Sequence, residues 1–358
     1  MRVLYFGTYE RDYPRNAQTI SCLRAAGVEV LERHVGVWEG RRHKFTAGAG
    51  AALRLARAEV ALLLRRAPEP FDAVLVGYPG HLDLPAARRA ARGRPVVFSP
   101  LVSLTDTLVE DRGRFTPGSL PARLVRFLDR RALRAADLVV ADTDANATYL
   151  RALAGLAPDA VATCFVGAEE RLFTPGWRRP VRFVALFVGK LIPLHGLETI
   201  LAAAALAPEL PFRVVGGGQL EPLLRAPPPN VEHVPWVEYE RLPAELHRAG
   251  CALGVFGTSA KATRVIPNKA FQALACGAPL VTADTPGARE LLRDGESALL
   301  VPPGDPRALA GAVRRLAEEA ELAERIGAGG HAAYRATASE EVLGRRWRGL
   351  LAGLLAGP

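Results

Sequence analysis

Short apolar runs alternate with longer helix-type segments along nearly the whole chain, and this alternation limits the possible folds more than any other feature. In the first half the alternation extends from residue 2 to residue 166. The predicted strands are 2–7, 28–33, 73–77, 96–99, 138–141 and 161–166, and the predicted helices are 16–26, 47–66, 85–92, 121–136 and 146–153. Repeated strand–helix units of this kind indicate a parallel sheet that is covered by helices on both faces.

A second series begins after segment 171–180, whose proline and glycine content is typical of a linker. Its predicted strands are 183–188, 212–215, 231–233, 252–255, 280–283 and 298–301, and its predicted helices are 196–207, 242–249, 268–276, 288–294, 306–319 and 339–355. The chain is therefore predicted to have an α/β fold with two doubly wound, Rossmann-like domains, residues 1–170 and 181–338, facing a cleft.

The length of 358 residues suits two such domains, and the net charge of +9 is unevenly divided between them. Residues 1–180 hold 27 Lys and Arg against 19 Asp and Glu, whereas residues 181–358 hold 19 against 18. A basic first domain favours an anionic membrane surface or an acidic acceptor, unless the arginines reflect coding bias alone. A nucleic-acid partner is not expected, because zinc-finger spacing and basic stripes interleaved with aromatic residues are both absent from the sequence.

Four cysteines, Cys22, Cys164, Cys251 and Cys276, lie far apart and form no metal-binding or redox pair, which fits a reduced cytoplasmic protein. No apolar run approaches the roughly 18 residues that a membrane span needs. The N-terminal run 2–7 is followed by charges and is interpreted as a strand, not as a signal peptide. We therefore expect a cytoplasmic protein. Its basic charge favours association with the inner face of a membrane.

The most informative segment for function runs from Val265 to Val281. Pro267 and Asn268 form a helix start signal, with Asn268 as the expected N-cap. The first turn of a helix exposes unpaired N–H groups and a partial positive charge, to which Lys269 adds a full charge. A cationic helix N-terminus between two strands suits a phosphate group.

The pattern Pro-Asn-Lys-x-Phe-x-x-Leu-Ala-x-Gly-x-Pro-x-Val over residues 267–281 resembles the donor-site helix of GT-B glycosyltransferases of the family 4 type. The resemblance covers most of 181–310 closely and 1–165 loosely. It implies that residues 339–358 form a helix that packs back on the first domain. It also implies transfer of a sugar from a nucleotide sugar with retention of configuration, without an essential metal or other cofactor.

In this family a loop with two cations grips the donor diphosphate, and Lys190 and His195 stand at the matching positions. The resemblance assigns donor-phosphate binding to Lys190, His195, Arg264, Asn268 and Lys269, and Lys190 and His195 are also catalytic candidates. Two acids that the family carries around this helix are replaced here by Arg264 and Gln272. Gln272 keeps the ability to accept a hydrogen bond from a ribose, whereas Arg264 changes the charge beside the donor sugar.

Two further elements match the family's nucleotide site by position. A glycine-rich turn follows a predicted strand, so Gly217 and Gly218 are expected beside the nucleotide. Trp236 and Val237 follow the next strand, where the family recognises the base. Packing of Trp236 in the core is the alternative interpretation.

In the first domain the candidate residues follow predicted strands, beyond which ligands collect in open α/β sheets. Gly7, Arg15 and Asn16 are expected on the acceptor side. His81 and Asp106 are candidates for a direct role in acceptor binding or catalysis, and capping is the alternative for both. No metal site is predicted, because the acidic segment 142–144 is better explained as a cap.

These residues lead to the hypothesis of a metal-independent, retaining hexosyltransferase in polysaccharide or glycolipid assembly. Its partners would be a nucleotide sugar and a glycan or lipid-linked acceptor. Two alternatives stay open. A nucleotide-sugar epimerase on the same fold would need acid–base carboxylates, and a catalytically silent binding subunit is favoured by the two replaced acids. The donor base, the sugar, the acceptor and the oligomeric state are left open by the sequence.

Overall fold

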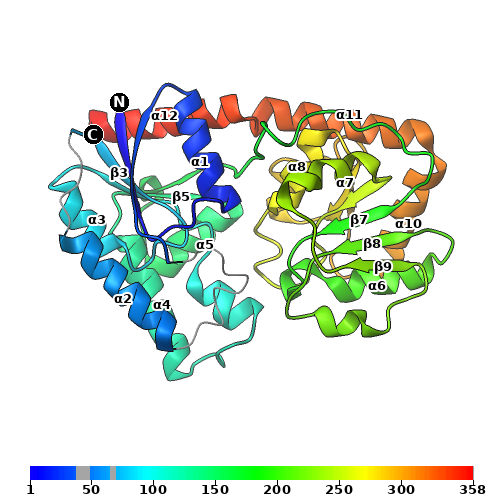
Figure 1. The fold of residues 1–358 in the computed structure, drawn as a ribbon, viewed down its shortest axis with the longest axis horizontal. Helices are drawn as coiled ribbons and strands as arrows, with labels where there is room; N and C mark the ends of the chain where they lie inside the picture. The colour runs from blue at the N-terminus through cyan, green and yellow to red at the C-terminus, as the bar shows by residue number, and fades with distance from the viewer. Residues whose placement is uncertain (38–48, 65–69, 358) are drawn as a thin grey trace. The chain divides into compact units, whose positions relative to one another are not determined.

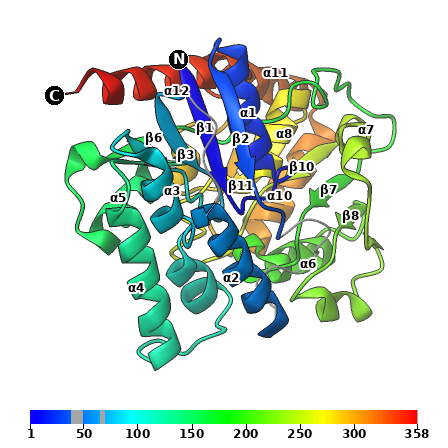
Figure 2. The same cartoon turned by 60° about the vertical axis from the view of Figure 1, so that its left-hand side comes forward.

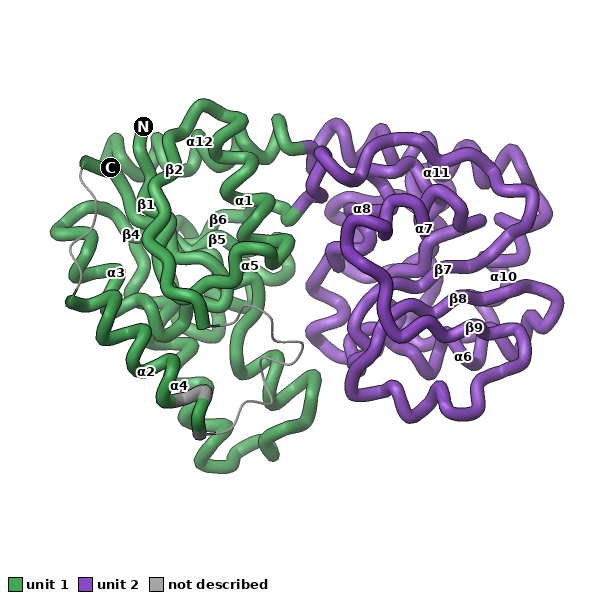
Figure 3. The backbone as a smooth tube through the Cα atoms, viewed as in Figure 1, with its two compact units in different colours: residues 1–166, 340–358 green, residues 167–339 purple. Residues whose placement is uncertain are grey.

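The computed structural model describes residues 1–37, 49–64 and 70–357, and the chain divides into two compact units (Figure 3). Unit 1 comprises residues 1–166 and 340–358, and unit 2 comprises residues 167–339. The helix predicted over 47–66 lies partly outside the described residues. Within the described ranges, we find no helix with the length and apolar character that crossing a membrane requires.

Unit 1 contains a six-stranded parallel sheet in the order β2-β1-β3-β4-β5-β6. The strands are β1 (Arg2–Gly7), β2 (Glu29–His34), β3 (Ala73–Val76), β4 (Val96–Phe98), β5 (Leu138–Ala141) and β6 (Val161–Thr163). Every residue of the central strands β3, β4 and β5 is buried. Such continuous burial is expected when helices cover both faces of a parallel sheet.

The helices of unit 1 start and end largely where the sequence predicts. They are α1 (Pro14–Ala25), α2 (Ala49–Leu64), α3 (Leu84–Ala91), α4 (Leu120–Arg134) and α5 (Asp144–Ala154), followed by the C-terminal α12 (Glu340–Ala356). The hydroxyl of Thr143 caps α5 by accepting from the backbone N–H of Asn146 at 3.0 Å, which confirms the capping role of segment 142–144. Asp106, which follows the predicted strand 96–99, lies at the start of a π-helical turn, Asp106–Asp111.

The C-terminal helix α12 packs on α1, as Figures 1 and 2 show, and completes the core of unit 1. Leu343, Trp347 and Leu351 are fully buried in one cluster with Tyr5 and Leu23. A Cβ atom at Gly344 would overlap the carbonyl oxygen of Cys22, so a glycine is needed for this close approach. The predicted return of the C-terminal helix to the first domain is confirmed.

Unit 2 contains a second six-stranded parallel sheet, in the order β12-β11-β10-β7-β8-β9. Its strands are β7 (Ala185–Val188), β8 (Phe212–Val215), β9 (Val231–Val234), β10 (Cys251–Leu253), β11 (Leu280–Ala283) and β12 (Leu299–Val301). Its α-helices are α6 (Leu197–Leu206), α7 (Leu242–Arg248), α8 (Asn268–Cys276), α9 (Pro286–Arg289), α10 (Pro306–Glu318) and α11 (Ala320–Thr337). The α/β class with two Rossmann-like sheets is thus confirmed.

Helix α11 is not predicted from the sequence, because its glycines are typical helix breakers. Its small residues allow close contact with neighbouring backbone. A Cβ atom at Gly327 would overlap the carbonyl oxygen of Gly277, and one at Gly329 would overlap that of Glu296. Packing against α8 therefore outweighs the low helix propensity of these residues.

Candidate functional site

The strand order of unit 2 predicts a ligand site beyond the carboxyl ends of β7 and β10. From β7 the chain first adds β8 and β9 on one side, and then β10, β11 and β12 on the other side. Ligands of open α/β sheets bind where this order reverses. The segments that leave β7 and β8 and the one that enters α8 carry most of the candidate donor residues.

The loop after β7 is held in place by one of its side chains, His195, which contacts the loop backbone and the strand β7. The Nδ1 atom of His195 bonds to the carbonyl oxygen of Lys190, and the ring packs edge-on against Phe187 with centroids 5.6 Å apart. Because a carbonyl accepts but cannot donate, Nδ1 carries the proton, and Nε2 can donate to a phosphate when the ring is an imidazolium. His195 is buried, whereas Lys190 is exposed.

The glycine turn after β8 is joined to this loop by backbone hydrogen bonds. The N–H of Gly189 donates to Val215 at 2.9 Å, and the N–H of Leu191 donates to Gly217 at 3.1 Å. A Cβ atom at Gly216, whose φ is +130°, would overlap the carbonyl oxygen of Gly189. The close approach brings the turn that holds Gly217 and Gly218 beside the Lys190 loop.

Replacing Gly216 with alanine is expected to lower the free energy of unfolding of unit 2 by about 3 kcal/mol, because it adds both a strained φ and a backbone overlap. Urea denaturation would measure the loss. The matched control is Gly311→Ala in α10, where a Cβ atom meets nothing within 4 Å. That control should gain about 0.5–1 kcal/mol. Equal midpoints for the two variants would contradict the close packing of the turn.

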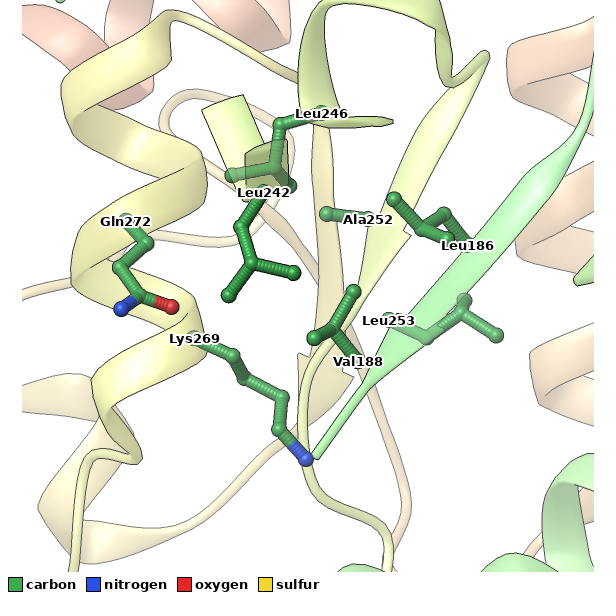
Figure 4. A pocket seen from close by; sticks show the side chains of 8 residues that line it. All are labelled: Leu186, Val188, Leu242, Leu246, Ala252, Leu253, Lys269 and Gln272. Atoms are coloured by element: carbon green, nitrogen blue, oxygen red, sulfur yellow. The ribbon is translucent and has the colours of Figure 1, made fainter. Parts of the chain in front are cut away.

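Helix α8 spans the predicted residues 268–276, but its N-cap lies one residue earlier than expected: Pro267 is the N-cap and Asn268 is the first helical residue. The next residue, Lys269, points its side chain toward the end of β7 (Figure 4). Its Nζ atom is buried, has no hydrogen-bond partner and lies 3.7 Å from the ring centroid of Phe187. Burial lowers the pKa of Lys269 well below its usual value. A buried amine without a partner is costly to keep, and groups with strongly shifted pKa values cluster at functional sites.

Lys269 and Gln272 line a small pocket that is otherwise apolar (Figure 4). Its other lining residues are Leu186, Val188, Leu242, Leu246, Ala252 and Leu253. Gln272 is buried, and its Nε2 donates to the hydroxyl of Tyr239 at 3.3 Å. The Tyr239 hydroxyl in turn donates to Glu169 at 3.1 Å. Tyr239 and Glu169 are not predicted from the sequence, because neither belongs to a motif.

The aromatic residue expected near the base is on the surface. Trp236 is 54% exposed, so the alternative of core packing is wrong. Its indole N–H donates to Glu238 at 3.1 Å, and Val237 beside it is half-buried. An exposed indole suits stacking with a planar ligand. Arg264 is half-buried in the turn before α8, where its backbone N–H donates to Lys261 at 3.0 Å.

In unit 1, the acceptor-side candidates serve the structure of the unit itself. The Asn16 amide oxygen accepts from Tyr5 and from the N–H of Tyr78, each at 2.9 Å, and its nitrogen donates to two carbonyl oxygens. Arg15 is buried and donates to Ser99 and to the backbone at Cys164 and Phe165. A Cβ atom at Gly7 would overlap Asp83. A role of these three residues toward an acceptor stays a prediction.

His81 lies beside a buried carboxylate, Asp129, and the sequence does not reveal this contact. Its Nε2 lies 3.3 Å from Oδ1 of Asp129, and both side chains are almost completely shielded from solvent. Asp129 also accepts from the backbone N–H groups of Leu104 and Thr105, each at 2.8 Å. Burial raises the pKa of Asp129, but the adjacent His81 side chain and hydrogen bonds from Thr105 outweigh it, and the net shift is downward. Asp106, the residue after Thr105, is also buried, and its backbone N–H donates to the hydroxyl of Ser103.

Metal-ligating side chains and cysteine thiols are two further kinds of group that could carry chemistry. Within the described ranges, no group of three or more His, Cys, Asp or Glu residues is arranged to hold a metal ion. The four cysteines are free and buried. Burial raises the pKa of the Cys164 thiol to about 11 and that of Cys276 to about 12. These thiols are therefore unreactive core residues.

Both halves of the chain match models of known protein families. Residues 2–167 match the glycosyl transferase 4-like domain, and residues 182–319 match glycosyl transferases group 1. A D-inositol 3-phosphate glycosyltransferase of Catenulispora acidiphila is 32% identical over 305 residues, which cover 74% of this chain and 71% of the relative. A protein of the same name from Thermobifida fusca is 30% identical over 289 residues, covering 72% of this chain and 63% of its own length.

Solved structures share the fold over essentially the whole chain. Sucrose-phosphate synthase from Thermosynechococcus elongatus has a TM-score of 0.75 at 19% identity, covering 100% of this chain and 99% of its own. The Anabaena protein HepE, solved in complex with UDP-glucose, has a TM-score of 0.69 at 17% identity, covering 99% of this chain and 100% of its own.

Proposed function

Because this chain belongs to the group 1 glycosyltransferase family, we propose that it moves a sugar from a nucleotide-sugar donor to a glycan or lipid-linked acceptor. We further propose that the transfer retains the anomeric configuration and needs no metal ion. The observation that carries the proposal is the buried, unpartnered Nζ of Lys269 at the start of α8. A donor diphosphate would supply the negative charge that this amine lacks.

The chemistry of the leaving group fits this edge of the sheet. Departure of a nucleoside diphosphate builds negative charge that must be stabilised without reorganisation. Lys269 and Lys190 would supply positive charge, and the first turn of α8 would supply N–H donors. Fixed cations can thereby take the part that a metal ion plays in other transferases. His81, Asp106 and His195 are the further catalytic candidates.

The donor is proposed to be a uridine diphosphate sugar. The support is that one protein of the same fold, HepE from Anabaena, was solved with UDP and with UDP-glucose. Trp236 would stack on the base, and Gln272 would accept from the ribose. Arg264 in place of an acid favours a donor or acceptor that carries negative charge. Inositol 3-phosphate, which appears in the names of the relatives, is such an acceptor.

The first test is a thermal-shift screen of UDP-, GDP- and ADP-sugars, followed by NMR of the anomeric proton of any product. A donor that raises the midpoint and gives a retained product, with and without EDTA, is expected. No shift with any nucleotide would overturn the proposal. A changed sugar without acceptor would assign an epimerase, and tight binding without turnover over many acceptors would assign a silent subunit.

Helix α4 of unit 1 supports the proposal that the protein binds an anionic membrane surface. Leu120, Leu124 and Phe127 lie on one face of α4 and are 78%, 58% and 57% exposed. Exposed arginines flank them at positions 123, 126 and 131, and the one acid of the helix, Asp129, is buried. An apolar stripe bordered by arginines suits insertion among anionic lipid headgroups.

The double variant Leu124→Glu/Phe127→Glu is expected to bind phosphatidylglycerol vesicles at least about tenfold more weakly, because it removes apolar contact and adds repulsion. Vesicle co-sedimentation at low and high salt would measure this. The control is Leu206→Glu on α6, which replaces a 43% exposed leucine of unit 2. Equal binding of both variants, or equal binding of the wild type to neutral vesicles, would contradict a role of α4.

A further inference from the structure

A chain of hydrogen bonds lies behind the pocket at α8, and its donors point from both ends toward the carboxylate of Glu169. Gln272 Nε2 is 3.3 Å from the Tyr239 hydroxyl, which is 3.1 Å from Oε1 of Glu169. Arg171 donates to the other oxygen of Glu169 at 2.8 Å. All four residues belong to unit 2. The chain therefore connects the solvent-facing Arg171 with a side chain that lines the pocket.

The chemistry of these groups fixes the direction of every bond. A carboxylate accepts but does not donate, so the single hydroxyl hydrogen of Tyr239 goes to Glu169. The Tyr239 oxygen can then only accept, and the Gln272 amide must present its NH₂ group to it. Burial, and then the charge of Glu169, raise the pKa of Tyr239, so the phenol keeps this hydrogen across the physiological pH range.

The fixed amide leaves one acceptor on the other side. Gln272 Oε1 accepts no hydrogen bond from the described residues and points toward the pocket, as Figure 4 shows. A glutamine without such a partner can turn its amide over and present either oxygen or NH₂. A hydroxyl donor is recognised best by a preoriented acceptor.

We propose that Glu169 and Tyr239 are positioning residues that hold Gln272 Oε1 as the acceptor for a ribose hydroxyl of the donor nucleotide. The inference rests on the proposed function. It explains how a neutral glutamine can serve where a carboxylate would accept with either oxygen. It also leaves Lys269, on the same pocket, without a neighbouring carboxylate at position 272 that would compete with the diphosphate.

The test measures binding of UDP, GDP and ADP and of their 2′- and 3′-deoxy forms. Wild type is expected to prefer at least one ribonucleotide over a deoxy form by about tenfold, the value of one well-made hydrogen bond. Tyr239→Phe should bring this preference close to one. The phenyl ring keeps the packing of Tyr239 against Phe173, whose centroids are 5.6 Å apart, so the fold is preserved. Inorganic pyrophosphate, which has no ribose, should bind both proteins equally.

A second variant reverses the chain without removing it. In Glu169→Gln, the new amide can donate to Tyr239, whose hydrogen can then turn to Gln272 and favour the flipped amide. This variant should also lose the ribose preference. Arg171→Met is the matched control, because it removes a contact of Glu169 but leaves the direction of the bonds unchanged. In a Gln272→Glu background, Tyr239→Phe should have little effect, because a carboxylate accepts with both oxygens.

The outcomes separate the inference from the proposed function. If wild type binds none of the nucleotides, the proposed function and the inference both fail. If wild type binds a nucleotide but shows no ribose preference, the positioning role is overturned and the proposed function stands. The same holds if Tyr239→Phe and Glu169→Gln keep the full preference while remaining folded.

Discussion

Lys269→Met is expected to make the protein more stable and its donor binding weaker at the same time. Methionine fills a similar volume without a buried amine, so the free energy of unfolding should rise by about 1–2 kcal/mol. Loss of one charged hydrogen bond to the diphosphate should weaken nucleotide binding about 10- to 100-fold. Urea denaturation and calorimetric titration with UDP would measure the two effects.

The gain in stability should depend on pH in a defined direction. Because the pKa of Lys269 is lowered in the folded state, the unfolded chain binds the proton more tightly. Titration of Lys269 therefore takes nothing from the free energy of unfolding of the wild type above the unfolded pKa of about 10.4. As the pH falls from there toward the folded pKa, the unfolded chain takes up the proton first, and the free energy of unfolding decreases. The advantage of Lys269→Met should accordingly grow from pH 10 toward neutrality.

Lys190→Met is the matched control, because Lys190 is exposed and its replacement brings no comparable gain in stability. It should weaken UDP binding and leave the unfolding midpoint nearly unchanged. Full UDP affinity in Lys269→Met would show that the buried amine is a structural feature of α8 and not part of a donor site.

Asp129→Ala is expected to lower the free energy of unfolding of unit 1 by about 3–5 kcal/mol. The substitution leaves His81 without its partner and two buried backbone N–H groups, at Leu104 and Thr105, without an acceptor. Differential scanning calorimetry would record a lower midpoint for unit 1. The exposed Asp159→Ala should change stability by less than about 0.5 kcal/mol.

The effect of Asp129→Ala should shrink in acid. The pKa of Asp129 is lowered in the folded state, so its contribution is complete above its unfolded pKa and is lost as the pH falls through the folded value. The difference in the free energy of unfolding between variant and wild type should therefore become smaller below about pH 4. A difference that stays constant down to pH 2 would mean that lost packing, and not the lost charge, causes the destabilisation.

Strand–helix alternation was sufficient to predict both sheets, because buried parallel strands require the same short apolar runs wherever they lie in the sheet. The start of α8 was predicted to within one residue from Pro267 and Asn268. Helix α11 could not be predicted, since glycines at 327 and 329 have a low helix propensity, and the packing they allow depends on residues far away in the sequence. In α11 the local sequence disfavours a helix, whereas packing against distant residues stabilises one.

The donor-side residues could be proposed from motifs, whereas their partners could not. Lys269 and Gln272 lie in one contiguous pattern, but Tyr239 and Glu169 join them from distant parts of the chain. Asp129 could not be identified from the sequence for a related reason. It is the one acid on an arginine-rich helix, and its partner His81 lies in another segment of the chain. Pairs of this kind are set by the tertiary fold.

The return of α12 to unit 1 sets an order of events during biosynthesis. Leu343, Trp347 and Leu351 can enter the core of unit 1 only after the whole of unit 2 has left the ribosome. At roughly 5–20 residues per second, the 173 residues of 167–339 impose a delay of roughly 10–35 s. Throughout this interval the surface of α1 that α12 covers is open to water and to chaperones. The second unit in the sequence is thus the first that can complete its fold.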